Sequence, residues 1–179
     1  MTRYAIFLRG VNVGGVTVRM ADLREVLGRL PLEGVATLLA SGNVVCRYDG
    51  DAGALKALVE GALREAFGYQ AWVVVVTAER LGELIDACPF PADSASTHTY
   101  VTLCSAPHVL DELEAAVTAA DHDAQEVRLG PEATAWVAPR GGTLDTPRSV
   151  LAAANRYKQF LTDRNLRTLL RVRKALDAL

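Results

Sequence analysis

The stretch YAIFLRGVNVGG at residues 4–15 decides how this chain folds, because a short apolar segment runs there into an arginine and a glycine-rich loop. The apolar part has the length and composition of a strand, and Arg9 closes it. Further along, Ser-Gly-Asn at residues 41–43 separates two more apolar segments, residues 37–39 and 44–46. Gly-Asn favours a two-residue hairpin turn, because glycine adopts positive φ without penalty. The sequence thus predicts a first strand with a hairpin beside it.

The elements around this hairpin follow from hydrophobic spacing. A helix is predicted from an apolar stripe that ends before Pro31 and consists of Met20, Leu23, Leu27 and Leu30. A second helix covers residues 55–67, and Gly68 stands where a C-terminal cap belongs. AWVVVV at residues 71–76 completes the set as a strand. The order β-α-β-β-α-β is typical of a ferredoxin-like plait, an α+β fold in which two helices cover one face of an antiparallel sheet.

The strand AWVVVV does not alternate between apolar and polar residues. A strand of this kind is covered on both faces, whereas a lone plait leaves one face of its sheet in water. We therefore expect residues 71–76 to be buried on both faces, by the second half of the chain or by a partner subunit.

The second half is predicted to be a partial plait-like repeat, β-α-β-β followed by C-terminal helices. Its expected elements are a helical stretch around residues 81–85, strands at 100–104, 126–129 and 134–138, and a helix at 110–120. We place the ferredoxin-like first half at residues 1–77, a linker helix and Pro-containing connector at 78–97, and the second α/β half at 98–179. The two halves are expected to pack as one globular unit.

The loop RGGTLDTP at residues 140–147 is either a connector or a cover over a site, and we favour the connector. Thr146 before Pro147 is a suitable N-cap for the helix that follows. The last helix is predicted to begin near Thr162. Its spacing places four basic residues on one side, Arg164, Arg167, Arg171 and Lys174.

Charge is unevenly distributed along the chain. Residues 140–179 hold nine Lys and Arg against three Asp and Glu, so this segment carries +6 while the whole chain carries −2. An acidic body therefore bears a basic C-terminal segment. The segment either attracts an anionic partner such as nucleic acid or docks on the acidic body of its own chain, and we favour the second interpretation.

Topology suggests where a ligand would bind. The two strands of a β-α-β unit run parallel, so the ends of the first and second strands lie at the same edge of the sheet. That edge would gather a guanidinium, amides, a hydroxyl and accessible backbone N–H groups from Arg9, Asn12, Gly14, Gly15, Ser41, Gly42 and Asn43. Such groups suit phosphate or carboxylate. The structural alternative is that the glycines make a tight reversal and Arg9 pairs with a carboxylate.

Four motifs carry a resemblance to a known family. LRGVNVGG, MADLREVL, SGNVV and TDRN are similar, in order and spacing, to the bacterial family named domain of unknown function 1697. The resemblance implies ferredoxin-like α/β halves and no established activity. It also adds Arg164 and Asn165 to the candidate ligand-binding residues, and it implies a recurrent polar position of the family at Thr162. This chain departs from the family in having Leu166 where a tryptophan is usual, and TLDTPRSVL where a Ser-Lys-Leu segment is usual.

Several classes of function find no support in the sequence. No apolar run approaches the ~20 residues of a membrane span, so we expect a cytoplasmic protein without a membrane partner. Cys46, Cys88 and Cys104 are widely separated, and they are interpreted as small core residues. The histidines are scattered, and we predict neither a metal nor a cofactor.

The favoured hypothesis is a binding module for an anionic small ligand at the edge formed by Arg9 and Asn43. One alternative is an enzyme that acts on a small phosphorylated substrate, although the motifs offer no general base. Another is an RNA- or nucleotide-binding protein that uses the basic C-terminal helix, with nucleic acid not favoured. The protein is expected to act as a monomer or a homodimer.

Overall fold

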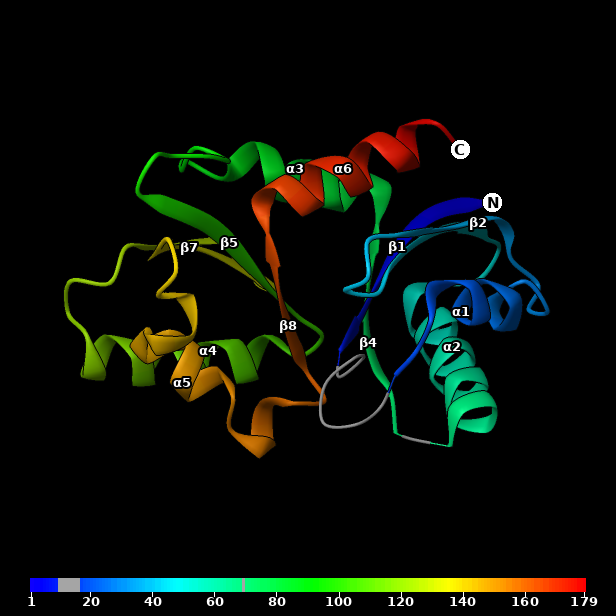
Figure 1. Cartoon of the computed structure of the whole chain (residues 1–179), viewed down its shortest axis with the longest axis horizontal. Helices are drawn as coiled ribbons and strands as arrows, with labels where there is room; N and C mark the ends of the chain where they lie inside the picture. The colour runs from blue at the N-terminus through cyan, green and yellow to red at the C-terminus, as the bar shows by residue number, and fades with distance from the viewer. Residues whose placement is uncertain (10–16, 69) are drawn as a thin grey trace. The chain divides into compact units, whose positions relative to one another are not determined.

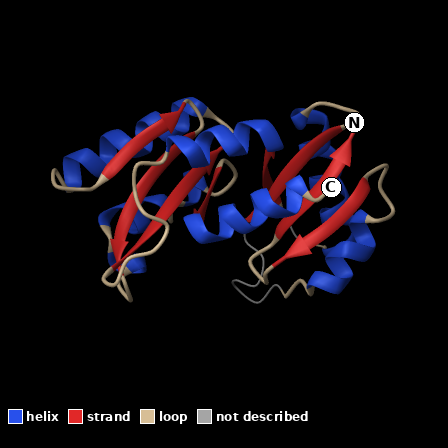
Figure 2. Cartoon of the chain, turned by 90° about the horizontal axis from the view of Figure 1, so that it is seen from above, coloured by secondary structure: helices blue, strands red, loops and turns tan. Residues whose placement is uncertain are grey.

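The computed structural model describes residues 1–9, 17–68 and 70–179. These residues form a mixed α+β structure with two four-stranded antiparallel sheets and six α-helices (Figures 1 and 2). The chain divides into two compact units, Met1–Gly82 with Arg171–Leu179, and Glu83–Leu170. The end of the last helix thus belongs with the first unit, although the sequence analysis placed all of that helix in the second half.

The first unit has the predicted order β-α-β-β-α-β. Its elements are β1 (Thr2–Arg9), α1 (Met20–Leu27), β2 (Glu33–Leu38), β3 (Asn43–Tyr48), α2 (Ala52–Phe67) and β4 (Trp72–Thr77), followed by α3 (Ala78–Ala87). The sheet has the strand order β2-β3-β1-β4. Because β3 is antiparallel to both β1 and β2, those two strands run parallel, as the topological argument requires.

Helices α1 and α2 lie side by side on one face of this sheet (Figure 1). The core between them joins sheet residues such as Ile6, Val44 and Val73 to helix residues such as Leu23 and Leu55. Both ends of α2 are capped as its sequence predicts. The Asp51 carboxylate accepts a hydrogen bond from Ala54 N at 2.7 Å, and Gly68, at φ 66°, donates its N–H to Arg64 O.

The opposite face of the first sheet is also buried. Val73 packs toward α1 and α2, whereas Val74 and Val76 point the other way and are only 5% and 7% exposed. The prediction that this strand is covered on both faces is confirmed. Part of the cover comes from the unit's own C-terminal segment, since Arg3 on β1 donates from Nη1 to Leu176 O at 3.1 Å and Leu176 is fully buried.

The second unit repeats the same order of elements. Its members are β5 (Thr97–Cys104), α4 (Pro107–Ala120), β6 (Glu126–Gly130), β7 (Ala133–Pro139), the short 3-10 helix η1 (Thr143–Asp145), α5 (Pro147–Ala152), a second 3-10 helix η2 (Asn155–Tyr157), β8 (Leu161–Asn165) and α6 (Leu166–Asp177). The strand order is β6-β7-β5-β8, which corresponds strand for strand to the first sheet. The sequence analysis predicted only the first three strands of this repeat and missed the fourth, β8.

Because β8 is a strand, the prediction for the start of the C-terminal helix is wrong. The helix was expected to begin near Thr162, but residues 161–165 form β8, antiparallel to β5 with Val101 opposite Arg164, and α6 begins at Leu166. An open strand edge offers backbone hydrogen bonds that outweigh a helical period read from side chains alone. Arg164 is consequently 8% exposed and does not belong to the basic stripe, which on α6 consists of Arg167, Arg171 and Lys174.

Helices α4 and α5 pack on one face of the second sheet. Their shared core includes Cys104 on β5, Leu110 and Leu113 on α4, and Ala152 on α5. The predicted cap is confirmed, because the Thr146 hydroxyl accepts a hydrogen bond from Ser149 N at 3.2 Å. None of the described helices is long and apolar enough to cross a bilayer.

Candidate functional site

The hairpin between β2 and β3 differs from the predicted two-residue Gly-Asn turn. Leu38 pairs with Asn43, so the loop has four residues and Asn43 is the first residue of β3. Two loop residues have positive φ, Leu39 at 60° and Gly42 at 76°. Leucine rarely adopts this conformation, which indicates that surrounding contacts impose it.

Asn43 holds this loop from inside the protein. Its side chain is fully buried and donates from Nδ2 to Leu38 O at 2.9 Å and to Ser41 Oγ at 3.0 Å. The loop is tied to the first strand as well, since Leu8 N donates to Gly42 O at 2.8 Å. Asn43 therefore shapes the loop with the amide that the sequence analysis assigned to a ligand.

The register supports the expected meeting of Arg9 with this loop. Phe7 is opposite Asn43, so the end of β1 and the loop lie at the same end of the first sheet. Arg9 itself is half-buried. Three further predicted site residues, Asn12, Gly14 and Gly15, lie outside the described residues.

The predicted C-terminal site residues interact within the second unit. Arg164 donates from Nη1 to Thr162 Oγ1 at 2.6 Å and to Asp163 O at 2.9 Å. Asn165 Oδ1 accepts a hydrogen bond from Arg167 N at 2.9 Å, which satisfies one of the free N–H groups in the first turn of α6. In these contacts the TDRN motif joins the last strand to the last helix.

The second unit contains a cavity that the sequence did not predict. It has a volume of about 600 Å³ and lies between the sheet and the segments that carry α4 and α5. Trp136 of β7 and Glu126 of β6 line it from the sheet, and Asp121 lines it at the end of α4. Residues 145–148 also line it, so the loop interpreted as a connector borders a cavity.

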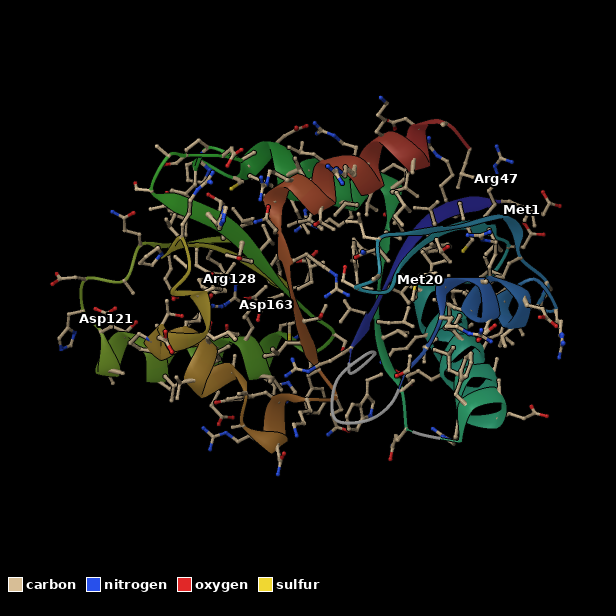
Figure 3. All side chains as sticks on the ribbon, in the orientation of Figure 1. Met1, Met20, Arg47, Asp121, Arg128 and Asp163 are labelled. Atoms are coloured by element: carbon tan, nitrogen blue, oxygen red, sulfur yellow. The ribbon has the colours of Figure 1, made fainter. Side chains whose placement is uncertain are left out.

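Arg148 is the central polar residue of this cavity. It is only 3% exposed, and its Nη1 forms an ion pair with Glu126 Oε1 at 2.6 Å. Its Nε and Nη2 donate to Thr102 Oγ1 at 3.3 and 3.1 Å. The same hydroxyl accepts from Trp136 Nε1 at 3.1 Å and donates to Asp163, which Figure 3 labels. Thr102 on β5 is thus linked to β7 through Trp136, to the edge strand β8 through Asp163, and to α5 through Arg148.

Aromatic rings stiffen the same wall. Tyr100 stacks on its cross-strand partner Trp136, with ring centroids 4.9 Å apart. The Arg148 guanidinium lies 5.8 Å from the centre of the Trp136 ring, within the range of a cation–π contact. The Tyr100 hydroxyl is 3.2 Å from Thr143 Oγ1, which attaches η1 to the sheet. Several contacts therefore fix the orientation of Trp136.

A second polar cluster borders the cavity. Arg128 pairs through Nη1 with Glu114 Oε2 at 2.6 Å and through Nη2 with Asp111 Oδ1 at 2.9 Å, and Thr134 donates to Glu114. A hollow of about 230 Å³ lies beside this cluster and shares Asp121, Ala124 and Glu126 with the larger cavity. Figure 3 labels Arg128 and Asp121.

The cysteines do not provide a reactive thiolate. Burial raises the pKa of the Cys46 thiol to about 11, and burial is also the main cause that raises the pKa of Cys88 and of Cys104. All three thiols are therefore protonated near neutral pH. The interpretation as core residues is confirmed for Cys46 and Cys104, which are buried, but not for Cys88, which is only partly buried. The described part of the chain holds no cluster of three His, Cys, Asp or Glu side chains arranged to bind a metal ion.

Sequence reasoning missed Arg148 and assigned Trp136 simply to the core. The available signal for Arg148 was its place in the first turn of a capped helix that has apolar residues on one side. An arginine in that position is ordinarily solvated. Only the packing of α5 onto the sheet buries it, and that packing depends on contacts distant in sequence.

Comparisons with known proteins agree with this α+β architecture. The family described as Protein of unknown function (DUF1697) matches residues 1–134, and the chain belongs to this family. The match ends before Trp136 and Arg148. The structure is similar to that of the conserved bacterial protein SP0830 from Streptococcus pneumoniae, with a TM-score of 0.82 and 23% identity over 99% of each chain. No curated protein matches, so the protein has no established activity.

Proposed function

We propose that this protein binds a small organic ligand in the cavity of its second unit. The observation that carries the proposal is a cavity of about 600 Å³ with Trp136 and the buried Arg148 in its wall. Ligand sites in proteins have volumes of ~300–1,000 Å³ and combine apolar and aromatic walls with a few fixed polar groups. The cavity has this size and this combination of groups.

The polar groups of the cavity are held before any ligand arrives. Glu126 and Thr102 fix the Arg148 guanidinium, and Tyr100 fixes the Trp136 ring. Ordered wall groups reduce the entropy that binding would otherwise cost. This arrangement favours recognition of one shape of ligand.

We also propose that each of the two units has the fold of a ferredoxin-like plait. Both units have the order β-α-β-β-α-β, and both sheets, read from the last strand, have the order fourth-first-third-second. In each unit two helices pack on the same face of the sheet. The proposal extends the sequence expectation, which assigned a full plait to the first half alone.

A second candidate is an anion site at the end of the first sheet, formed by Arg9 together with the loop of Ser41 and Gly42. It is favoured by the positive φ of Leu39 and by the buried Asn43 that holds the loop. Backbone conformations of this cost persist where other contacts stabilise them, and they concentrate at functional sites. A phosphate or carboxylate would be its ligand.

The cavity proposal is tested by filling the cavity. Ala124, which lines it, is replaced by Phe, and Ala66→Phe adds the same ring at an exposed position of α2 as a matched control. A fragment library containing cations, anions and neutral molecules is screened by thermal shift, because a ligand that binds only the folded state raises the melting temperature. Hits that stabilise the wild type and Ala66→Phe but not Ala124→Phe are expected. Hits indifferent to Ala124→Phe would contradict the proposal.

The two candidate sites are separated by one further variant. Stabilisation by inorganic phosphate that Arg9→Gln abolishes and Ala124→Phe preserves would assign anion binding to the first sheet. If Ala124→Phe fails to fold, the Trp72→Phe variant replaces it, because Trp136 is then the sole tryptophan and its fluorescence reports the cavity directly. Fragments that leave this fluorescence unchanged do not occupy the cavity.

A further inference from the structure

We propose that the ligand of this cavity carries a positively charged amine on a small apolar or aromatic body. The inference rests on the proposed function and adds the chemical class of the ligand. Its evidence is the cavity itself, the hydrogen bonds that already hold the Arg148 guanidinium, and the excess of carboxylates among the lining residues.

Arg148 is already held by the protein and is not a suitable anchor for an anion. Three of its nitrogens already donate, Nη1 to Glu126 and both Nε and Nη2 to Thr102. Each Nη keeps one further N–H, but the guanidinium is only 3% exposed and already has Glu126 as its counter-ion. An anion that reached these two groups would lie beside the Glu126 carboxylate, and the repulsion between two negative charges away from water is costly. The guanidinium therefore acts as part of the wall rather than as an anion anchor.

The remaining charges in the wall are negative. Asp121, Asp123 and Asp145 line the cavity together with Glu126, and Arg148 is the only Lys or Arg among the described lining residues. Since Glu126 matches Arg148, three carboxylates are left without a compensating cation. Asp121 Oδ1 accepts a hydrogen bond from Asp123 N at 3.1 Å, and within the described ranges none of the three aspartates forms an ion pair. A cation entering the cavity would meet favourable potential from several sides.

The walls between these carboxylates are suited to an apolar body. Val117, Ala138, Pro139 and Pro147 line the cavity with the Trp136 ring. An apolar wall near carboxylates suits an organic ammonium group, because the carboxylates attract its charge and the apolar surface accepts its carbon skeleton. A bare metal ion is not matched by such walls, since hard cations require a shell of oxygen ligands.

The experiment compares three probes with the same aromatic ring and different charge: phenethylamine, 2-phenylethanol and 3-phenylpropionate. Binding to the full chain is measured by calorimetry and by the fluorescence of Trp136 in the Trp72→Phe variant. Phenethylamine is expected to bind about tenfold or more tightly than the alcohol, a ratio that corresponds to about 1.4 kcal/mol. The carboxylate is expected to bind more weakly than the alcohol. Added salt should weaken binding of the amine alone.

Charge variants test the residues named. Asp123→Asn and Asp145→Asn are both at exposed positions and should fold normally. Each is expected to reduce phenethylamine affinity roughly two- to fivefold, as partly exposed charge pairs do, and to leave the alcohol unaffected. Glu65→Gln removes one carboxylate from an exposed position on α2 and is the matched control. Its affinity for every probe should equal that of the wild type.

The outcomes separate this inference from the proposed function. Equal binding of the three probes, or tighter binding of the carboxylate, would overturn the amine class and leave the cavity as a ligand site. The amine class would also be overturned if none of the three probes bound while other fragments altered Trp136 fluorescence and were blocked by Ala124→Phe. The cavity would then remain a ligand site. If no fragment of any charge alters that fluorescence, the proposed function itself is wrong.

Discussion

At the scale of single residues, Arg148 shows how one buried charge can organise a unit. Its ion pair with Glu126 and its bonds to Thr102 join α5 to the sheet at 3% exposure. A buried pair of this kind contributes little net stability compared with an apolar replacement, but breaking it leaves an uncompensated charge. The loss of unfolding free energy should therefore be larger when only one of Arg148 and Glu126 is replaced than expected from the effect of replacing both.

This reasoning predicts a non-additive mutant cycle. Arg148→Met should lower the free energy of unfolding by at most about 3–5 kcal/mol, because Glu126, whose side chain is only 16% exposed, is left without its partner. Arg148→Met combined with Glu126→Gln should lose clearly less than the sum of the single changes. Arg148→Lys should recover only part of the loss, since lysine lacks the fork that reaches Glu126 and Thr102 together. Urea denaturation of the four variants checks this, and strict additivity would contradict it.

Asn43 is the corresponding residue of the first unit. Asn43→Ala removes the donor to Leu38 O and Ser41 Oγ from a fully buried position, which should cost about 1–3 kcal/mol of stability. Ser41→Ala removes the Ser41 Oγ acceptor but keeps the bond to Leu38 O, and it serves as the milder comparison, at about 0.5–1.5 kcal/mol. The free energies of unfolding of both variants are to be measured by chemical denaturation. Equal losses for the two variants would show that the bond to Leu38 O does not hold the loop.

At the scale of elements, β8 and α6 show how one basic segment has two environments. Arg164 lies on the strand and is buried, whereas Arg167, Arg171 and Lys174 lie exposed on the helix. Arg167 pairs with Asp93 at 3.4 Å. Arg171 and Lys174 form no ion pair with any described residue. Self-docking of the basic segment is thus observed at one position of the helix.

Reversing the two remaining charges separates the two interpretations of the basic helix. We expect the wild-type chain not to bind RNA or DNA at low salt. The double variant Arg171→Glu/Lys174→Glu should change stability by less than about 1 kcal/mol, because both side chains are solvated. Arg167→Glu, which breaks the pair with Asp93, is the control for self-docking. Fluorescence anisotropy at two salt concentrations decides the question. Salt-sensitive nucleic-acid binding that the double variant abolishes would overturn this expectation.

At the scale of the whole molecule, the chain returns to its first unit at its end. Residues 171–179 belong to the unit that begins at Met1, and Val172 and Leu176 are fully buried there. The far face of the first sheet is apolar, with Ala5, Phe7 and Val45 also buried. The C-terminal segment should therefore contribute to stability out of proportion to its length.

Leu176→Ala tests this contribution. Truncating a fully buried leucine removes apolar contacts and leaves a cavity, which should cost about 2–5 kcal/mol. Lys174→Ala, an exposed position two residues earlier on the same helix, should change stability by no more than about 0.5 kcal/mol. The two variants are compared by thermal and urea unfolding. Similar small effects from both would show that the segment does not contribute to the core of the first unit.

The sequence by itself determined most of the elements, because their evidence is local. Periodicity predicted α2, Gly68 predicted its end, and the unbroken run of valines predicted that β4 is buried on both faces. Only the tertiary structure decided the rest. Whether residues 161–165 form a strand depends on the free edge of β5, and the burial of Arg148 depends on the packing of α5 against the sheet. The cavity likewise combines segments far apart in sequence. Such features arise from long-range contacts, which no local pattern of residues encodes.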